Sequence, residues 1–409
     1  IRLNASYSQY VGRLSETIAG AGSSNGSPAY FGYAYTGPDL LNVSPRVAVA
    51  AAIANFNANG GVNGTPFVTS IGGFDTKLQG TIKSPHVNEF TVGAGTQIGT
   101  NGFIRADYIN REYADFYVTT TNQQTGFVVE PKTGAKSDLK LVTNDNKFLS
   151  RKYNAVQAQA QYRLFQRVNL GTNYTYSTLK GNSIGENSGS GPITTGNFVF
   201  QYPEFNGFKQ NLPKGFLPDD QTHKVRAWAS FDQPTFVGNF NLSVLERFDS
   251  GTPFSTAGLI NTSSYIPSTD PIRKKYVSPP PTTTYFFGDR GRFRWDDVTA
   301  TDVALNYSTP SIRGLNFYVN AELFNAFNED AQIGGNTGVL TARNSTCKQG
   351  PNRDGARCAT FNPFTGTPVE GVNWQTAKGT KVGSTFRDPT SANSFQTPRL
   401  YRFSVGLRF

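Results

Sequence analysis

Ten segments of the chain alternate apolar and polar residues with a period of two. Since successive side chains of a strand point to opposite faces, each segment predicts a strand with one apolar and one polar face. The ten segments are residues 1–10, 88–99, 103–111, 154–164, 168–177, 223–232, 239–248, 299–308, 315–327 and 401–409. The last one reads YRFSVGLRF and is predicted to close a barrel wall with the apolar face formed by Tyr401, Phe403, Val405, Leu407 and Phe409.

The connections between these segments alternate between short and long. Short links join the second segment to the third (TNG), the fourth to the fifth (FQR), the sixth to the seventh (QPTFVGN) and the eighth to the ninth (TPSIRG). The connections before, between and after these pairs are long. This alternation is typical of outer-membrane barrels, which have short periplasmic turns and long extracellular loops. In a bilayer only a closed barrel satisfies the backbone groups of every strand. The sequence therefore predicts an all-β fold, a transmembrane antiparallel up-and-down β-barrel portion that covers residues 1–409.

Two of the predicted extracellular loops have features of their own. The loop at 11–86 contains SPRVAVAAAIANFNANGG, in which Ser44 can cap a helix and Pro45 suits its first turn. A short helix is therefore expected near residues 45–58. The loop at 329–396 holds both cysteines, Cys347 and Cys358, in a stretch rich in Gly, Pro and Asn.

Composition agrees with many strands and turns. The 409 residues include 32 Phe, 19 Tyr and 42 Gly, which suit strands and the turns between them. Only 37% of the residues are hydrophobic and no run of apolar residues reaches the length of a transmembrane helix. The net charge is +10, but the arginines are spread singly along strands, so no nucleic-acid partner is expected.

Few residues are candidates for chemistry. A disulfide between Cys347 and Cys358 is predicted, with free thiols as the alternative, because no histidine lies near them and their spacing does not suit a metal site. His223 follows Asp219 and Asp220 at the expected outer rim, where a barrel protease could activate water. No facing pair of acids is visible in the sequence. Neither an enzyme activity nor a metal or cofactor is therefore expected.

Several stretches together resemble a known family. They include GFIRADYINREYADFYV, DDQTHKVRAWASF, DRGRFRWDDVTATDVALNY, NAELFNAFNED and RLYRFSVGLRF, in this order. They are similar to the C-terminal barrel of TonB-dependent outer-membrane receptors, particularly the Oar-like group. The resemblance implies a location in the outer membrane of a Gram-negative-type bacterium and import of an extracellular solute. It also implies a barrel of about 22 strands, of which this chain shows ten.

The same resemblance implies partners and leaves an alternative. Expected partners are outer-membrane lipid and lipopolysaccharide, the barrel assembly machinery, and the TonB motor, which would act through a plug domain that this chain does not show. The chain is therefore interpreted as the C-terminal part of a transporter. The alternative is a smaller passive or structural barrel, or a surface-assembly component.

Residues that bind the solute are expected on the loops and the inner wall. Aromatic planes suit sugars or peptides, and arginine suits carboxylates. The same side chains could instead pack the loops or anchor the barrel at the membrane interface. The candidates are Tyr33, Tyr35, Tyr202, Phe205, Arg290, Arg292, Arg294 and Trp295.

Overall fold

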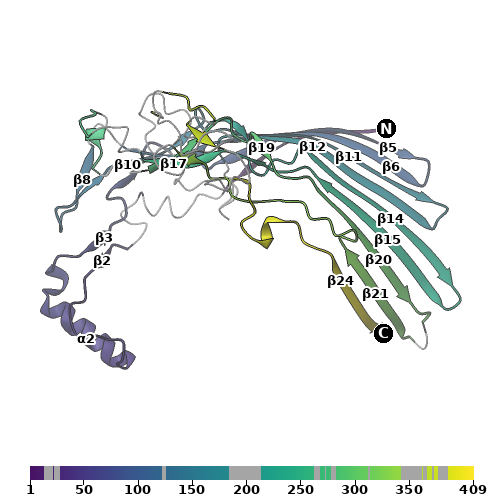
Figure 1. Cartoon of the computed structure of the whole chain (residues 1–409), viewed down its shortest axis with the longest axis horizontal. Helices are drawn as coiled ribbons and strands as arrows, with labels where there is room; N and C mark the ends of the chain where they lie inside the picture. The colour runs from purple at the N-terminus through teal and green to yellow at the C-terminus, as the bar shows by residue number, and fades with distance from the viewer. Residues whose placement is uncertain are drawn as a thin grey trace, which may run out of the picture.

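One curved antiparallel sheet with a large loop region at one end makes up the described protein (Figure 1). The computed structural model describes residues 1–12, 22, 28–121, 126–183, 213–261, 268–271, 273–277, 282–311, 314–341, 362, 366–370, 373–375 and 386–409. Among these residues, no helix is long and apolar enough to cross a membrane.

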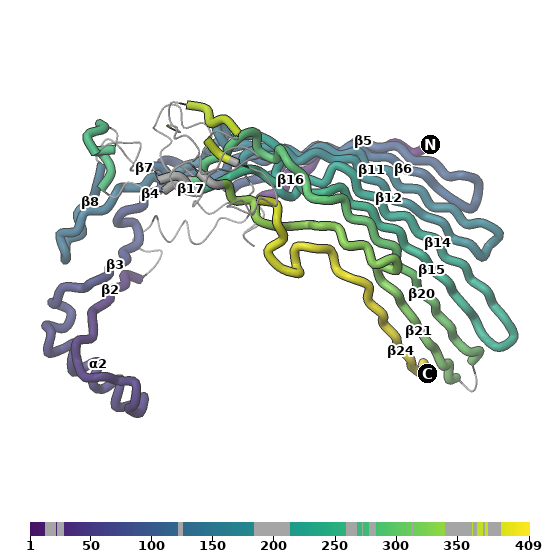
Figure 2. The backbone as a smooth tube through the Cα atoms, in the orientation of Figure 1, coloured from purple at the N-terminus to yellow at the C-terminus, as the bar shows by residue number. Residues whose placement is uncertain are grey.

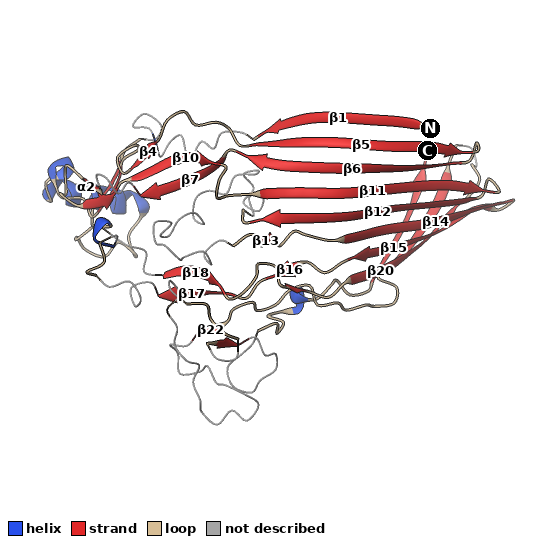
Figure 3. Cartoon of the chain, turned by 90° about the horizontal axis from the view of Figure 1, so that it is seen from above, coloured by secondary structure: helices blue, strands red, loops and turns tan. Residues whose placement is uncertain are grey.

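Ten long strands form the sheet in chain order. They are β1 (Arg2–Val11), β5 (His86–Ile98), β6 (Gly102–Ala114), β11 (Arg151–Leu164), β12 (Val168–Gly181), β14 (His223–Thr235), β15 (Gly238–Asp249), β20 (Val298–Ser308), β21 (Asn316–Phe324) and β24 (Leu400–Arg408). Each pairs antiparallel with the next, and the short β13 (Gly215–Phe216) adds to β12. Figure 3 shows the strands side by side from β1 to β20. The predicted all-β, up-and-down antiparallel fold is confirmed.

The short turns lie together at one end of the sheet and the long connections at the other (Figure 1). The three-residue link between β11 and β12 places Phe165 and Gln166 at φ of 48° and 57°, and the Arg167 amide donates to the Leu164 carbonyl at 3.1 Å. Positive φ at both central residues gives a turn whose twist suits a hairpin. Two of these turns carry aromatic tips, Phe165 and Phe236, both almost fully exposed. Apolar groups at this end suit an interface with lipid headgroups better than contact with bulk water.

The loop region contains short strands and helices. The strands are β2 (Tyr30–Gly32), β3 (Val68–Ser70), β4 (Thr76–Leu78), β7 (Phe116–Thr121), β8 (Phe127–Val129), β9 (Lys136–Asp138), β10 (Lys140–Asp145), β16 (Pro253–Phe254), β17 (Ala257–Asn261), β18 (Thr282–Phe286), β19 (Phe293–Arg294), β22 (Leu340–Thr341) and β23 (Trp374–Gln375). The helices are α2 (Pro45–Ala58), η1 (Gly61–Asn63), η3 (Arg273–Lys275) and η4 (Ala392–Ser394). The most buried apolar side chains, Leu217 and Phe287, also lie here, so the core of the described protein sits beside the sheet's loop end.

Helix α2 covers the stretch that the sequence predicts to be helical and lies far from the sheet (Figure 2). None of its residues is buried. Phe56 meets the ring of Tyr33 edge-on at 4.9 Å between centroids, and the Asn55 amide donates to Thr36 Oγ1 at 3.3 Å. The helix therefore packs on its own loop.

The two faces of the sheet differ in chemistry across all ten strands. One cross-strand row of the apolar face joins Phe231, Leu242, Leu305, Ala321 and Phe403. Because strand register fixes which face each side chain occupies, the alternation of every strand adds to the same two faces. In β24 the apolar side chains Tyr401, Phe403, Val405 and Leu407 are all more than half exposed. They remain available to an apolar surrounding.

Candidate functional site

Salt bridges between neighbouring strands run along the polar face. Arg226 of β14 contacts Asp249 of β15 at 2.7 Å, and Arg247 of β15 contacts Asp302 of β20 at 3.0 Å. Further pairs join Arg111 to Glu89, Arg402 to Glu322 and, within β6, Arg105 to Asp107. Most of the charge on this wall is therefore neutralised locally, and each cross-strand pair adds a specific link to the backbone ladder.

Uncharged amides occupy the part of the wall between β5 and β12. Gln97, Gln157, Gln159, Gln161 and Asn173, which we call the amide patch, are exposed. In the described part of the chain none of their side chains is hydrogen-bonded. Each carboxamide offers two donors and an acceptor. The patch therefore has unused hydrogen-bonding capacity that faces away from the sheet.

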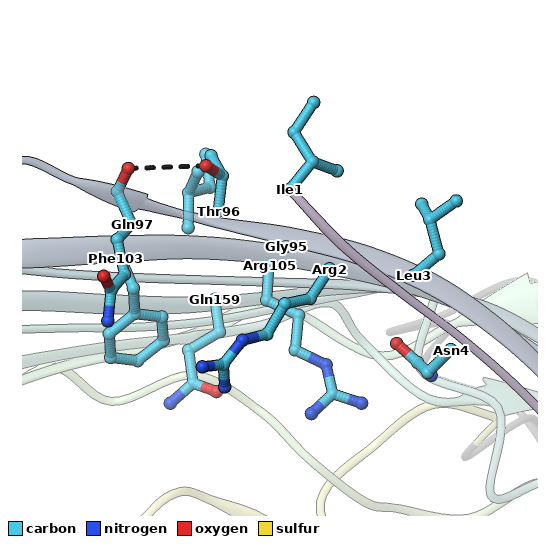
Figure 4. Close-up of a pocket in the computed structure, with 11 residues that line it drawn as sticks. Ile1, Arg2, Leu3, Asn4, Gly95, Thr96, Gln97, Phe103, Arg105 and Gln159 are labelled. Carbon is cyan, nitrogen blue, oxygen red and sulfur yellow. Dashed lines mark hydrogen bonds between the residues drawn. The ribbon is translucent and has the colours of Figure 1, made fainter.

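Two hollows lie over the amide patch. The larger, of about 920 Å³, is bordered by Arg2, Asn4, Gln97, Phe103, Arg105 and Gln159. Arg2, Asn4, Arg105 and Gln159 point to one side of the sheet, whereas Ile1 and Leu3 point to the other (Figure 4). The smaller hollow, of about 460 Å³, extends over Gln157, Asn173 and Thr175. Both volumes lie in the range of small-molecule sites.

Four of the predicted ligand-binding residues lie close together at the loop end of the sheet, around β19. The indole of Trp295 stacks on Phe254 at 4.0 Å between ring centroids. Arg294 donates to Asp220 Oδ2 at 2.5 Å and to the Gly251 carbonyl at 2.8 Å. These two side chains therefore hold the loops together.

The neighbouring arginines differ in exposure. Arg290 is buried, donates to the Asn182 carbonyl at 3.1 Å, and its guanidinium lies over the Phe286 ring. Burial disfavours the charged form and lowers the pKa of Arg290 to about 10. Arg292 is well exposed and contacts Glu370 at 3.1 Å. Of these three arginines, Arg292 is the one placed to meet a ligand from solution.

The other predicted ligand-binding residues lie elsewhere. Tyr33 and Tyr35 come directly after β2, in the loop that carries α2, and Figure 1 shows β2 and α2 at a distance from β19. Tyr202 and Phe205 lie outside the described residues. Cys347 and Cys358 also lie outside them, so their disulfide stays a prediction. The six candidates that the structure describes therefore do not form one site.

His223 has different neighbours from those a rim protease would need. Its Nδ1 lies 2.9 Å from the Tyr174 hydroxyl. The Asp220 carboxylate instead accepts the Leu179 amide at 2.5 Å and pairs with Arg294. Among the described residues, no three His, Cys, Asp or Glu side chains are grouped to hold a metal ion.

Sequence reasoning overlooked Trp228. In HKVRAWASFD it occupies a position of the polar face, in phase with Arg226 and Ser230. A bulky aromatic residue among polar ones was the available signal. The structure lays its indole against Gly171 of the neighbouring strand, where an added Cβ would come within 2.2 Å of the ring.

Among known proteins, the chain matches solved structures only. No family model and no curated protein matches the chain. The outer membrane transporter YddB from Escherichia coli superimposes with a TM-score of 0.37 at 13% identity, over 66% of this chain and 32% of the transporter. The copper transporter OprC superimposes with a TM-score of 0.34 at 11% identity, over 83% of this chain and 32% of the transporter. The chain thus spans about a third of the length of either transporter.

Proposed function

We propose that this chain forms part of the wall of an outer-membrane β-barrel in a Gram-negative-type bacterium, within a TonB-dependent transporter that imports an extracellular solute. The main support is the antiparallel sheet of ten long strands, which has one apolar face and one polar face with salt bridges. Lipid-facing and lumen-facing residues alternate in this way along the strands of membrane barrels. The Oar-like resemblance rests on sequence stretches alone.

On the apolar face, the side chains of β6 and β11 change from apolar to polar toward the loop end, which supports a membrane boundary there. Exposed Tyr108 and Val156 lie opposite each other at the edge of the apolar band of β6 and β11. The next pair on this face toward the loop end is Asn110, which donates to Asn154, and the pair after it is Glu112 with Lys152 at 2.7 Å. Tyrosine followed by charged residues is the order expected where hydrocarbon meets headgroups.

The open edges of the sheet support a wall that other strands complete. Among the described strands, β1 and β24 have one neighbour each. Unpaired backbone groups cost several kcal/mol each in hydrocarbon, so a bilayer requires closure. The proposed partners follow from the sequence resemblance: a plug domain linked to the TonB motor, the barrel assembly machinery, and lipopolysaccharide around the wall.

Thiol labelling of neighbouring residues in β11 tests the membrane part of the proposal. In the full-length protein with Cys347 and Cys358 replaced by serine, Val156→Cys and Gln157→Cys place a thiol on opposite faces. In outer-membrane vesicles a water-soluble maleimide should label the Gln157→Cys thiol and spare the Val156→Cys thiol until detergent removes the lipid. Equal labelling of both thiols in vesicles would refute a lipid-facing apolar wall.

Solute uptake tests the transporter part. Cells that lack the gene should leave in the medium at least one solute that wild-type cells remove, as measured by mass spectrometry of spent medium. A protonophore should abolish the difference, because the TonB motor depends on the proton gradient. Uptake that depends on the gene but persists with the protonophore would favour the passive barrel instead.

A further inference from the structure

Three rows of side chains cross β6, β11 and β12 on the apolar face of the sheet. Cross-strand register aligns them, and successive rows lie about 7 Å apart along the strands. Toward the loop end the rows change from apolar and aromatic groups, through uncharged hydrogen-bonding groups, to charged groups. In that order they are Tyr108, Val156 and Tyr176, then Asn110, Asn154 and Thr178, then Glu112, Lys152 and Lys180. This part of the face therefore presents three layers of chemistry to its surroundings.

The charged row has an excess of positive charge. Lys152 lies directly opposite Lys180, and like charges in this position repel each other. Glu112 pairs with Lys152 at 2.7 Å. The Lys180 ammonium instead lies over the ring of its other cross-strand neighbour, Phe216, at 4.5 Å from the centroid. In the part of the chain that the structure describes, Lys180 has no acid partner.

A third lysine extends the charged row past β12. Lys214 directly precedes β13 and is exposed. Since the side chains of a strand alternate, a residue two positions before Phe216 lies on the same face as Phe216. No acid among the described residues pairs with Lys214. Lys152, Lys180 and Lys214, which we call the lysine cluster, therefore place three positive charges beside the one negative charge of Glu112.

The middle row offers hydrogen bonds to an uncharged group. Asn154 Oδ1 accepts from the Asn110 amide at 2.8 Å and from the Tyr108 hydroxyl at 3.2 Å. Neither the Asn154 amide N–H groups nor the Thr178 hydroxyl has a hydrogen-bond partner among the residues described. Hydroxyl groups of a ligand could both donate to and accept from this row.

We propose that the lysine cluster binds the phosphate of a glycolipid in the outer leaflet of the membrane. This assignment rests on the proposed function, in which the apolar face of the sheet meets lipid. The acyl chains lie along Val156 and Tyr176. The sugar groups hydrogen-bond to Asn154 and Thr178, and the phosphate meets the lysine cluster. Lysine binds phosphate as a point charge, and basic clusters beside hydrocarbon attract anionic headgroups.

Other classes of ligand each lack one of the three layers. Inorganic phosphate has no group for the apolar row, and an anionic phospholipid has no sugar ring for the middle row. A neutral glycolipid leaves the repulsion between Lys152 and Lys180 in place. A phosphorylated glycolipid matches all three rows in the order in which β11 and β12 present them.

Native mass spectrometry of the full-length protein in a mild non-ionic detergent tests the proposal by lipid titration. The probes are lipid A, which is the phosphorylated glycolipid of lipopolysaccharide, the same lipid A with its phosphates removed, and phosphatidylglycerol as an anionic lipid without a sugar ring. Phosphorylated lipid A should bind about tenfold more tightly than either of the other two. Equal binding of phosphatidylglycerol would mean a general attraction to anionic lipid and would overturn the assignment.

Removal of two lysines should weaken this binding. Lys180→Ala/Lys214→Ala leaves the pair of Glu112 and Lys152 intact. A lysine at a membrane surface contributes about fivefold to the affinity for anionic lipid, so the double variant should bind phosphorylated lipid A about 20- to 30-fold more weakly. Lys180→Arg/Lys214→Arg keeps both charges and should retain most of the affinity.

Lys224→Ala/Arg163→Ala is the matched control, because it removes two exposed cations from the polar face of β14 and β11. It should leave the affinity for lipid A unchanged. Absence of lipid A binding, equal binding with and without phosphates, or equal losses in the two double alanine variants would each overturn the assignment. Because thiol labelling in β11 does not depend on the lysine cluster, that experiment separates failure of this assignment from failure of the membrane proposal.

Discussion

Replacing Asp220 with asparagine should loosen the loop end of the sheet more than any exposed charge substitution. The Asp220 carboxylate has no exposed surface and pairs with Arg294, which keeps 31% of its side chain in contact with water. Breaking a fully buried ion pair costs about 3–5 kcal/mol, because the remaining charge stays buried without its partner. Since Arg294 is partly hydrated, we expect about 2–3 kcal/mol for Asp220→Asn.

Hydrogen exchange measures this loss where it occurs. The Leu179 amide donates to Asp220, and Arg294 belongs to β19, so amides in both segments report local opening. A loss of 2–3 kcal/mol corresponds to exchange about 30- to 150-fold faster. Glu112→Gln is the control, since its pair with Lys152 is exposed on both sides and is worth at most about 1 kcal/mol. If both variants accelerate exchange equally, burial of the Asp220 pair is not what stabilises this region.

Three further outcomes are expected. Phe403→Arg, on the apolar face of β24, should lower the free energy of unfolding by about 2–4 kcal/mol, seen on gels as a smaller folded, heat-modifiable fraction. Ser404→Arg, on the polar face, should leave that fraction unchanged. Burial raises the pKa of Tyr285 to about 12, so its phenol loses the proton at lower pH in the unfolded chain than in the folded one. The free energy of unfolding should therefore fall between about pH 10 and 12. Chemical denaturation at each pH measures this fall, and Tyr285→Phe should remove it. An alkylating reagent should modify Cys347 and Cys358 in the denatured chain only after reduction, and alkylation without reductant would exclude the disulfide.

The strands were predictable from sequence because both faces of the sheet impose period-two patterns over many residues. In β11 the pattern is almost strict, since Ala158, Ala160 and Tyr162 alternate with glutamines. β15 shows why one irregular position does little harm: Leu245 falls on the polar face beside Arg247, yet twelve cross-strand pairs with β14 hold the register. Local pattern and sheet register thus specify the same arrangement.

The loop end could not be predicted in this way, because its contacts join residues far apart in the chain. In YFFGDRGRFRW, the sequence leaves Arg290, Arg294 and Trp295 open to two uses, ligand binding or loop packing. Two of their partners, Asn182 and Asp220, come from the connection that follows β12, and a third, Phe254, comes from the far end of their own connection. Aromatic and arginine side chains serve binding and packing through the same interactions, so composition alone does not separate the two uses.

Trp228 was predictable only in part. Its face followed from alternation, but its role depends on Gly171, a residue of another strand whose missing side chain makes room for the indole. A glycine in a strand weakens it and often marks a close approach by another group. A large aromatic residue in phase with charged neighbours, opposite a strand glycine, is therefore a pattern worth seeking in other barrel walls. Rings in this position differ in their neighbours: Arg408 lies over the ring of Tyr318, which faces Gly406, whereas in the described part of the chain no cation or aromatic ring stacks on Trp228.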